Sequence, residues 1–249
     1  MLVCLNGRFI PREDAQVSIH DGAFLYGGSL FETLKACGNR ILLQRLHLDR
    51  LARSAQLLGI PCPRQRIESA LMQLAAALPA PYSRIRLTLS RGPYDGLQFP
   101  ADQEAWFLIT AVPLAPAATR DAGVTCIIAP NRRVNPLSHL PQMKRGNYAD
   151  CLYARNHARR CGADEALFID QHGNLLEGAT SNLFALIERR LVTPPPGELI
   201  LDGIMRRQVI AAARELGILC VERTLSVDEM QNADEAFITN AIIDLQPIG

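Results

Sequence analysis

The hydrophobic period changes repeatedly along the chain, and this feature restricts its fold more than any other. Residues 29–35 alternate between apolar and polar side chains, as a half-buried strand does, and residues 41–43 pair back after a Gly-Asn turn. Between residues 46 and 58 the apolar side chains recur at helical intervals, until Gly59 ends the helix. A chain that switches between both periods is expected to fold as a mixed α/β protein.

Similar patterns predict further elements in both halves. Further strands are expected at residues 2–5, 8–10, 84–89, 106–112, 165–169, 182–187, 191–192, 220–224 and 235–239. Further helices are expected at residues 64–78, 147–161 and 205–216.

A Pro- and Ala-rich segment separates the two halves, and its composition is typical of a linker. A chain of 249 residues is long enough for one large or two small domains. We therefore predict a small N-terminal α/β domain over residues 1–113, a linker over 114–120 and a C-terminal domain over 121–249.

Composition excludes several classes of function. The 26 Lys plus Arg balance 25 Asp plus Glu, so no strong field attracts nucleic acid. No leader peptide and no apolar run of the ~20 residues needed to cross a bilayer is visible, so we expect a cytoplasmic protein without membrane contact. The seven Cys lack CxxC spacing and are expected to be reduced. Their spacing to the five His supports no metal site.

Only two of the basic residues are lysines, Lys35 and Lys144. Lysine, unlike arginine, can lose its proton in a protein and form a Schiff base. Lys35 ends an alternating strand, where a solvated lysine is common. Lys144 lies between a loop and a helix, and Gly146 beside it permits close backbone approach. These residues alone leave Lys144 open between a surface lysine and a reactive one.

Three other segments carry polar groups that could bind a ligand. Residues 202–205 lead into a helix, and the free N–H groups at a helix N-terminus bind phosphate. Thr239 and Asn240 end the last predicted strand and offer polar donors. Residues 177–182 form a small-residue loop that begins with a carboxylate, although such a segment is also an ordinary turn.

Seven blocks of sequence, spread over nearly the whole chain, share one order and spacing with a known family. They lie at residues 21–33, 47–51, 144–148, 164–166, 176–184, 203–206 and 233–240. Together they resemble the class IV aminotransferase family, the fold-type IV pyridoxal-phosphate enzymes. The resemblance implies a two-domain fold in which the larger C-terminal domain has a barrel-like mixed sheet. It also implies pyridoxal 5'-phosphate as cofactor, a small amino or carboxylate substrate and a homodimer.

The resemblance also implies roles for individual residues. Lys144 would hold the cofactor as an internal aldimine and transfer the substrate Cα proton. Glu177 would pair with the pyridinium nitrogen and keep the ring able to accept electrons. Tyr148 would lie near the phenolic oxygen of the cofactor, although this loop is one residue shorter than in the branched-chain enzymes.

The cofactor phosphate would be held by a second group of residues. Arg50, in a His-x-x-Arg block, would clamp it directly. The rest of the implied cofactor-binding set is Ile204 and Met205 through their backbone amides, Thr239, Asn240 and Thr180.

The family includes D-amino-acid aminotransferases, branched-chain aminotransferases and aminodeoxychorismate lyases, which diverge after the α-proton is removed. Residues 132–136, 203–206 and 239–241 look most like the lyase, which converts 4-amino-4-deoxychorismate to pyruvate and p-aminobenzoate for folate biosynthesis. Against the lyase, residues 93–96 replace a Gly-rich stretch that is often seen there. The Arg-x-His signature of the D-amino-acid enzymes is not visible after residues 90–92.

We therefore predict the lyase reaction. The alternatives are a D-amino-acid or branched-chain aminotransferase of the same fold and a non-catalytic paralogue that binds pyridoxal phosphate. Candidate residues for contacting the substrate are Arg91, Arg86, Tyr26 and Phe31.

Overall fold

The computed structural model describes all residues except 1, 79, 95, 99–104 and 116–122. The chain divides into two compact units. Unit 1 comprises Met1–Pro116 and Met143–Asn147, and unit 2 comprises Ala117–Gln142 and Tyr148–Gly249. The division differs from the predicted domains because the short segment around Lys144 belongs to unit 1. Most of the predicted linker, residues 114–120, lies outside the described residues.

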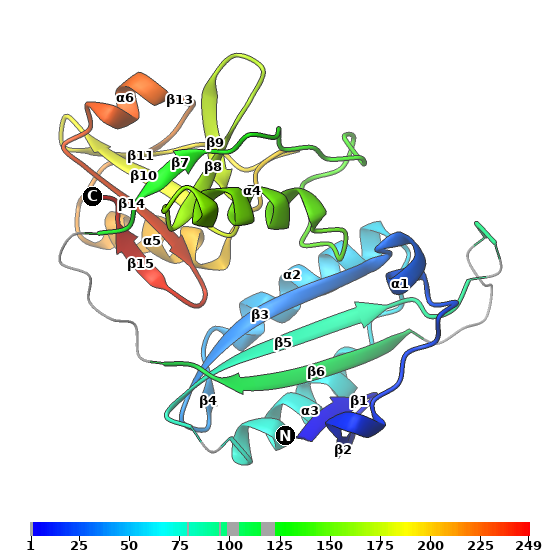
Figure 1. The fold of residues 1–249 in the computed structure, drawn as a ribbon. Helices are drawn as coiled ribbons and strands as arrows, with labels where there is room; N and C mark the ends of the chain where they lie inside the picture. Colours follow the sequence, from blue (N-terminus) through cyan, green and yellow to red (C-terminus); the bar gives the residue numbers. More distant parts are fainter. Residues whose placement is uncertain (1, 79, 95, 99–104, 116–122) are drawn as a thin grey trace. The chain divides into compact units, whose positions relative to one another are not determined.

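Unit 1 is built on a six-stranded antiparallel sheet with the strand order β2-β1-β6-β5-β3-β4 (Figure 1). Its strands are β1 (Leu2–Leu5), β2 (Arg8–Pro11), β3 (Ser29–Cys37), β4 (Arg40–Ile41), β5 (Tyr82–Ser90) and β6 (Trp106–Pro113). Its helices are α1 (Gly22–Tyr26), α2 (Gln44–Leu57) and α3 (Arg64–Ala76), with a 3₁₀ turn at Arg12–Asp14. Figure 1 shows α2 and α3 against the same face of this sheet.

The alternation in β3 decides which side chains face the helices. Glu32 bonds to residues of α2, so it lies on the helix-covered face together with the buried Leu34. Phe31 and Thr33 therefore lie on the opposite face of the sheet. On α2 the buried Leu48, Leu51 and Ala55 have helical spacing, which confirms the predicted strand and helix.

Unit 2 contains two sheets, with strand orders β12-β11-β10-β14-β15 and β13-β9-β8-β7. The strands of the first are β10 (Asn182–Ile187), β11 (Arg190–Thr193), β12 (Cys220–Glu222), β14 (Glu235–Asn240) and β15 (Asp244–Pro247). Those of the second are β7 (Cys126–Ile128), β8 (Glu165–Ile169), β9 (Asn174–Gly178) and β13 (Leu225–Ser226). The helices are α4 (Ala149–Arg160), α5 (Ile204–Glu215) and α6 (Val227–Gln231). The described strands thus form two sheets and not one closed barrel.

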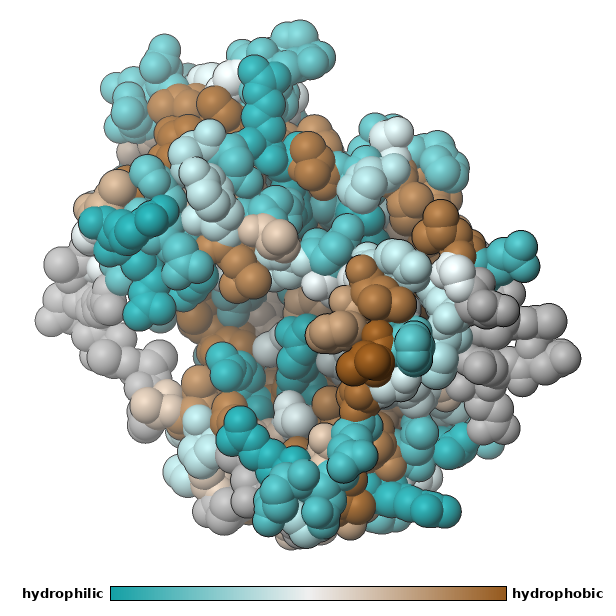
Figure 2. All heavy atoms as spheres, turned by 45° about the vertical axis from the view of Figure 1, so that its right-hand side comes forward, coloured by the Kyte–Doolittle hydropathy of each residue, from teal (hydrophilic) through white to brown (hydrophobic). Residues whose placement is uncertain are grey.

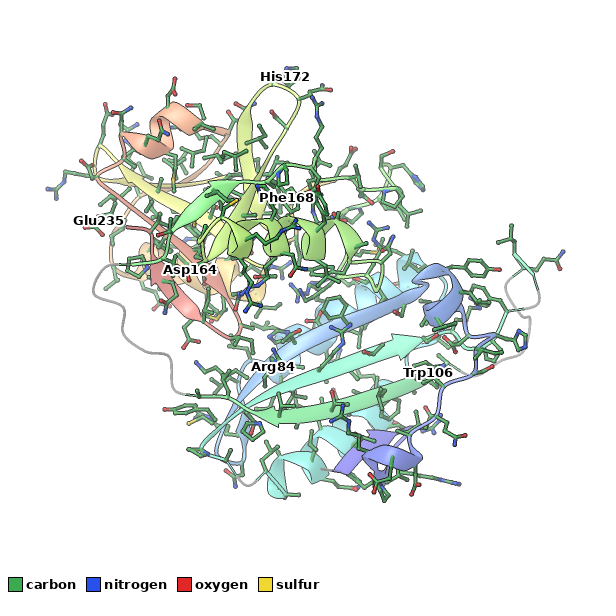
Figure 3. All side chains as sticks on the ribbon, viewed as in Figure 1. Arg84, Trp106, Asp164, Phe168, His172 and Glu235 are labelled. Atoms are coloured by element: carbon green, nitrogen blue, oxygen red, sulfur yellow. The ribbon has the colours of Figure 1, made fainter. Side chains whose placement is uncertain are left out.

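Helix α4 covers β8, and small side chains allow a close approach. Cys151, Ala154 and Ala158 of α4 are buried in one cluster with Ala166 and Phe168 of β8. Phe168, labelled in Figure 3, is fully buried at this contact. A second cluster joins both sheets of unit 2, with Leu175 of β9 packed among Leu183 of β10 and Ile238 of β14. The two sheets therefore share one apolar layer.

Several large apolar side chains of unit 1 are exposed. Val17, Ile19, Phe24 and Leu25 lie in or just before α1 and are 45 to 70 % exposed. Figure 2 shows hydrophobic residues, in brown, among hydrophilic ones on the face of the molecule that it displays. All seven cysteines are free thiols. Among the described residues, no helix has the length and apolar character to cross a membrane, and no group of three or more His, Cys, Asp or Glu is placed to hold a metal ion.

Candidate functional site

The backbone around Lys144 is fixed against β3 within unit 1. The Phe31 amide donates to the Lys144 carbonyl at 2.9 Å, and the Gly146 amide donates to the Ser29 carbonyl at 2.7 Å. A Cβ at Gly146 would lie 2.1 Å from the Ser29 Oγ, so a larger residue there would have to displace the Ser29 side chain. The close approach predicted at Gly146 is therefore confirmed, and Lys144 occupies a defined position beside β3.

The Phe31 ring contacts two cationic side chains on the face of the sheet opposite α2. The Lys144 Nζ is 4.7 Å from the centre of the Phe31 ring, and the Arg86 Cζ is 3.9 Å from the same centre. Arg86 comes from β5, where it is paired with Thr33 of β3. Both distances are within the range of cation–π contacts. The structure thus brings two of the predicted substrate residues, Phe31 and Arg86, close to Lys144.

The other two substrate candidates have different contacts. Arg91 donates from Nη1 to the Gly59 carbonyl just after α2. The Tyr26 hydroxyl donates to the Gly96 carbonyl at 3.2 Å, and its ring stacks on Tyr94 with centres 5.8 Å apart. None of these contacts involves Lys144. Lys35 lies elsewhere on β3, with its Nζ 5.7 Å from the centre of the Tyr82 ring.

Arg50 is buried and pairs with a glutamate that the sequence analysis did not single out. Its Nε and Nη2 donate to the two oxygens of Glu32 at 2.8 and 2.6 Å, and His47 Nδ1 lies 2.7 Å from Glu32 Oε2. Burial would raise the pKa of Glu32, but the Arg50 charge and hydrogen bonds from His47 and Arg50 outweigh it and lower the pKa to about 2. The bidentate pair fixes the orientation of the guanidinium.

Glu177 is a buried carboxylate at the end of β9 in unit 2. Its Oε1 lies 3.2 Å from Arg133 Nη2. Its Oε2 accepts hydrogen bonds from the Asn182 side-chain amide at 3.3 Å and from the Leu201 backbone amide at 3.0 Å. Three donors thus converge on this buried carboxylate and fix its orientation.

Arg133 is the second charged group of this cluster, and its guanidinium also lies 2.7 Å from Asp150 Oδ2. Burial would lower the pKa of Arg133, but the charges around it, with Glu177 first, outweigh burial and raise the pKa above its ordinary value. Its Cζ lies 5.5 Å from the centre of the Phe168 ring. In the sequence, residues 132–136 indicate only a likeness to the lyase, and nothing there predicts the ion pair between Arg133 and Glu177.

Tyr148 immediately precedes α4, and its hydroxyl donates to the Ala179 carbonyl at 3.2 Å. Burial, together with the nearby Cys151 and Glu177, raises the pKa of Tyr148 well above its ordinary value. The phenol therefore stays protonated at neutral pH and can donate a hydrogen bond.

The start of α5 is held close to the Glu177 cluster. Gly203 caps the helix, and a Cβ there would lie 1.9 Å from the Asn182 Oδ1. The same Asn182 side chain donates to the Leu201 carbonyl at 2.9 Å and to Glu177. The first backbone N–H groups of the helix, at Ile204 and Met205, have no acceptor within the helix itself. They form the kind of N-terminus that binds phosphate.

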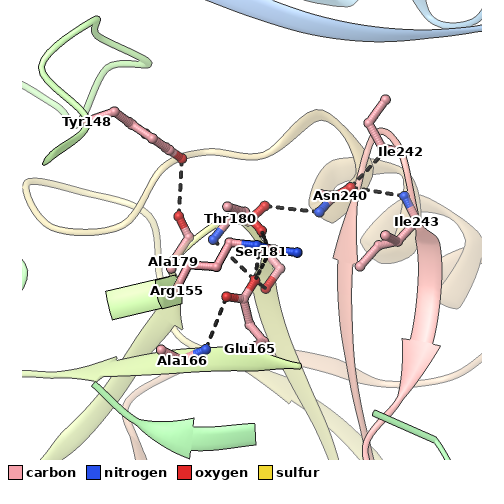
Figure 4. Close-up of polar contacts among 10 residues, drawn as sticks. All are labelled: Tyr148, Arg155, Glu165, Ala166, Ala179, Thr180, Ser181, Asn240, Ile242 and Ile243. Carbon is pink, nitrogen blue, oxygen red and sulfur yellow. Dashed lines mark hydrogen bonds and ion pairs between the residues drawn. The ribbon is translucent and has the colours of Figure 1, made fainter. Parts of the chain in front are cut away.

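The end of β14 contacts the turn that follows β9. Thr239 is buried opposite Asn182 of β10, and its hydroxyl donates to the Asp244 carbonyl. The Asn240 side-chain amide donates to the Thr180 carbonyl at 3.1 Å (Figure 4). Its Oδ1 accepts from the backbone amides of the turn between β14 and β15 at 2.8 and 3.0 Å. The predicted cofactor residues of unit 2 thus lie near one another. The other two, Lys144 and Arg50, belong to unit 1.

A family model for amino-transferase class IV matches residues 29–249. The chain belongs to the class IV aminotransferase family. It is 33 % identical over 252 residues to a putative branched-chain-amino-acid aminotransferase of Methanocaldococcus jannaschii. The alignment covers 100 % of this chain and 87 % of the relative. The predicted family is therefore confirmed.

Two solved structures show the same similarity at the level of the fold. One is a branched-chain aminotransferase from the archaeon Thermoproteus uzoniensis with norvaline, with a TM-score of 0.89, 29 % identity and coverage of 100 % of this chain and 86 % of that one. The other is 4-amino-4-deoxychorismate lyase from Pseudomonas aeruginosa, with a TM-score of 0.89, 28 % identity and coverage of 99 % and 90 %. The fold alone therefore does not separate the aminotransferase from the lyase.

Membership in the class IV aminotransferases makes this chain a pyridoxal-phosphate-dependent enzyme, either an aminotransferase or a lyase. The donor set of the structure fits that cofactor. A buried carboxylate held by three donors matches a protonated ring nitrogen, and a helix N-terminus matches a phosphate.

Proposed function

We propose that this class IV enzyme is an aminotransferase that acts on branched-chain amino acids. The observation that carries the proposal is the 33 % identity, over the whole chain, to a relative named as a putative branched-chain-amino-acid aminotransferase. The branched-chain aminotransferase of Escherichia coli, 29 % identical over 258 residues, gives the same support. These relatives favour the aminotransferase over the lyase predicted from the short motifs.

The residues proposed to hold the cofactor are those implied by the sequence motifs. Lys144 binds it covalently between turnovers, and Glu177 pairs with its ring nitrogen. Tyr148 lies near its phenolic oxygen. The phosphate is bound by Arg50, by the backbone amides of Ile204 and Met205, and by Thr239. Asn240 and Thr180 complete the set of residues proposed to bind the cofactor.

Pyridoxal phosphate, when bound, supplies a conjugated ring that accepts the electrons released when the substrate Cα loses its proton. The chain supplies the proton transfer and the charge balance. Lys144 Nζ would take the proton from the substrate Cα and hold it for its return in the next step of the transfer. Glu177, held by Arg133, Asn182 and Leu201, would accept a hydrogen bond from the protonated ring nitrogen.

Arg86 is the proposed ligand of a substrate carboxylate. Its guanidinium and the Lys144 amine contact the same Phe31 ring, at 3.9 and 4.7 Å from its centre. Arginine can bind a carboxylate through two parallel N–H groups, which suits Arg86 to this role. Arg91 is the weaker candidate because it donates to the Gly59 carbonyl.

The lyase is the second candidate, favoured by the structural similarity to the Pseudomonas aeruginosa lyase. The two reactions are separated by their products. The purified holoenzyme is offered L-leucine with 2-oxoglutarate in one assay, and 4-amino-4-deoxychorismate in another. We expect 4-methyl-2-oxopentanoate and glutamate from the first, and neither pyruvate nor p-aminobenzoate from the second.

Lys144→Ala and Lys35→Ala provide the matched pair of variants for this assay. Activity is expected to be lost in Lys144→Ala and kept in Lys35→Ala. Pyruvate and p-aminobenzoate formed in equal amounts, with no transfer from leucine, would instead establish the lyase. Transfer from D-alanine alone would point to the D-amino-acid enzymes.

A further inference from the structure

The carboxylate of Glu165 is the centre of a buried polar cluster in unit 2. Glu165 is the first residue of β8 and is 2 % exposed. Its Oε2 accepts hydrogen bonds from the Thr180 hydroxyl at 2.7 Å, the Thr180 amide at 3.3 Å and the Ser181 hydroxyl at 3.2 Å. Its Oε1 accepts from the Ala166 amide at 3.1 Å, and Arg155 Nη1 lies 3.6 Å from Oε2. Figure 4 shows these contacts converging on one carboxylate.

These donors belong mainly to the turn formed by residues 178–181, which joins β9 to β10. Within the turn the Gly178 amide donates to the Ser181 carbonyl at 2.7 Å. A Cβ at Gly178 would lie 2.2 Å from the Ser181 Oγ and 3.1 Å from the Glu165 Cγ. The turn and the carboxylate are therefore packed against each other without spare room, and Glu165 fixes the conformation of the turn.

The same turn contacts three residues that are proposed to bind the cofactor. It begins directly after Glu177 in the chain. Its Ala179 carbonyl accepts the hydrogen bond from Tyr148, and its Thr180 carbonyl accepts the one from Asn240. A movement of the turn would thus displace the partners of all three residues together.

Glutamine cannot replace Glu165 in this cluster without loss. Both carboxylate oxygens face donors, so the NH₂ group of a glutamine meets a donor in either orientation of the amide. At least one hydrogen bond to the side chain is then lost and a repulsive contact replaces it. Hydrogen bonds to a charged acceptor are about twice as strong as neutral ones, so the turn loses much of its restraint.

We propose that Glu165 is a positioning residue, which holds the turn so that Glu177, Tyr148 and Asn240 are presented to the cofactor together. It acts through the turn and does not itself contact the reacting atoms. The inference rests on the proposed roles of those three residues. It also assigns the Thr180 hydroxyl and amide to the support of Glu165. Thr180 then serves the site by holding Asn240 through its carbonyl and does not itself contact the cofactor.

The test compares Glu165→Gln and Thr180→Val with Thr180→Ser, which keeps the hydroxyl. The dissociation constant for pyridoxal phosphate is measured by titrating each apoenzyme, and the visible circular dichroism of the bound cofactor reports its orientation. Glu165→Gln and Thr180→Val are expected to raise the dissociation constant about tenfold and to weaken the dichroic band. Thr180→Ser, which keeps the hydroxyl, is expected to show the dissociation constant and the dichroic band of the wild type.

Glu229→Gln is the matched control for general stability. Glu229 is also in unit 2, where it closes the capping box of α6 with Ser226 and pairs with Arg223 at 2.9 Å. Its loss is expected to lower the melting temperature while cofactor affinity is unchanged. If Glu229→Gln raises the dissociation constant as much as Glu165→Gln does, the effect is one of stability and the inference is overturned.

Unchanged affinity and dichroism in both Glu165→Gln and Thr180→Val would also overturn it. If Glu165→Gln does not fold, the two Thr180 variants decide. Lys144→Ala and Glu177→Gln distinguish this outcome from a failure of the proposed function. If Lys144→Ala and Glu177→Gln change the cofactor spectrum but the Glu165 and Thr180 variants do not, only the positioning role of Glu165 is refuted. If Lys144→Ala and Glu177→Gln also leave the spectrum unchanged, the proposed cofactor residues themselves are wrong.

Discussion

Replacing Glu32 with glutamine tests whether the buried ion pair with Arg50 stabilises the fold through its charge. The pKa of Glu32 is about 2, against an ordinary value of 4.5, because Arg50 and His47 outweigh the effect of burial. The folded state therefore binds the proton more weakly than the unfolded state does. The stabilisation is complete above pH 4.5 and is lost as the pH falls from 4.5 towards 2.

The pKa difference sets the size of the effect. A shift from 4.5 to about 2 corresponds to about 3 kcal/mol of the free energy of unfolding at neutral pH. At pH 3 about 2 kcal/mol of this has been lost, which leaves about 1 kcal/mol. The value at neutral pH agrees with the ~3–5 kcal/mol cost of breaking a buried ion pair.

Urea unfolding of the wild-type apoenzyme and Glu32→Gln between pH 7 and pH 3 measures this directly. The titrating groups that do not contact Glu32 are common to both proteins, so the difference between their free energies of unfolding reports Glu32 together with its partners His47 and Arg50. Glu68→Gln is the control, because Glu68 pairs with Arg64 at 2.8 Å but is 42 % exposed, and a change under about 1 kcal/mol is expected. A Glu32→Gln difference that is below 1 kcal/mol at pH 7, or that does not shrink towards pH 3, would refute the reasoning.

Two further predictions concern single contacts. Arg133→Met leaves Glu177 and Asp150 without their buried partner, so we expect urea unfolding to show about 3–5 kcal/mol of destabilisation. The control is Arg223→Met, which should cost under about 1 kcal/mol because the Arg223 side chain is 39 % exposed. Equal losses of stability in the two variants would contradict the prediction. Gly146→Ala should displace the Lys144 segment and weaken cofactor binding, measured by titration, because its Cβ would lie 2.1 Å from Ser29 Oγ. Ser29→Ala should partly restore binding in the double variant, and Gly197→Ala, with no atom within 4 Å, should have no effect.

The strands and helices that the sequence predicted are those with a clear period. β8 and β10 have the predicted bounds, and α2 and α5 begin and end within two residues of them. β9 was not predicted because Leu175, Leu176 and Glu177 are all buried and so show no alternation. Helix α1 has only five residues, too few for a helical period, although Asp21 caps it through a hydrogen bond to the Ala23 amide.

The candidate residues could be found because they lie in local blocks, but their partners could not. Glu32 precedes Arg50 by 18 residues and Glu165 precedes Thr180 by 15, and nothing in a single sequence marks such pairs. The choice of the lyase rested on three short blocks, whereas similarity over the whole chain favours the branched-chain aminotransferases. Short blocks near the cofactor are shared by enzymes with different reactions, so they could not decide between them.

The most direct test of the account is to locate the covalent attachment of the cofactor. The chain has only two lysines, so reduction of the holoenzyme with borohydride, digestion and mass spectrometry give an unambiguous position. We predict a phosphopyridoxyl group on Lys144 and none on Lys35. A label on Lys35, or a reduced holoenzyme with no label on either lysine, would contradict the central claim.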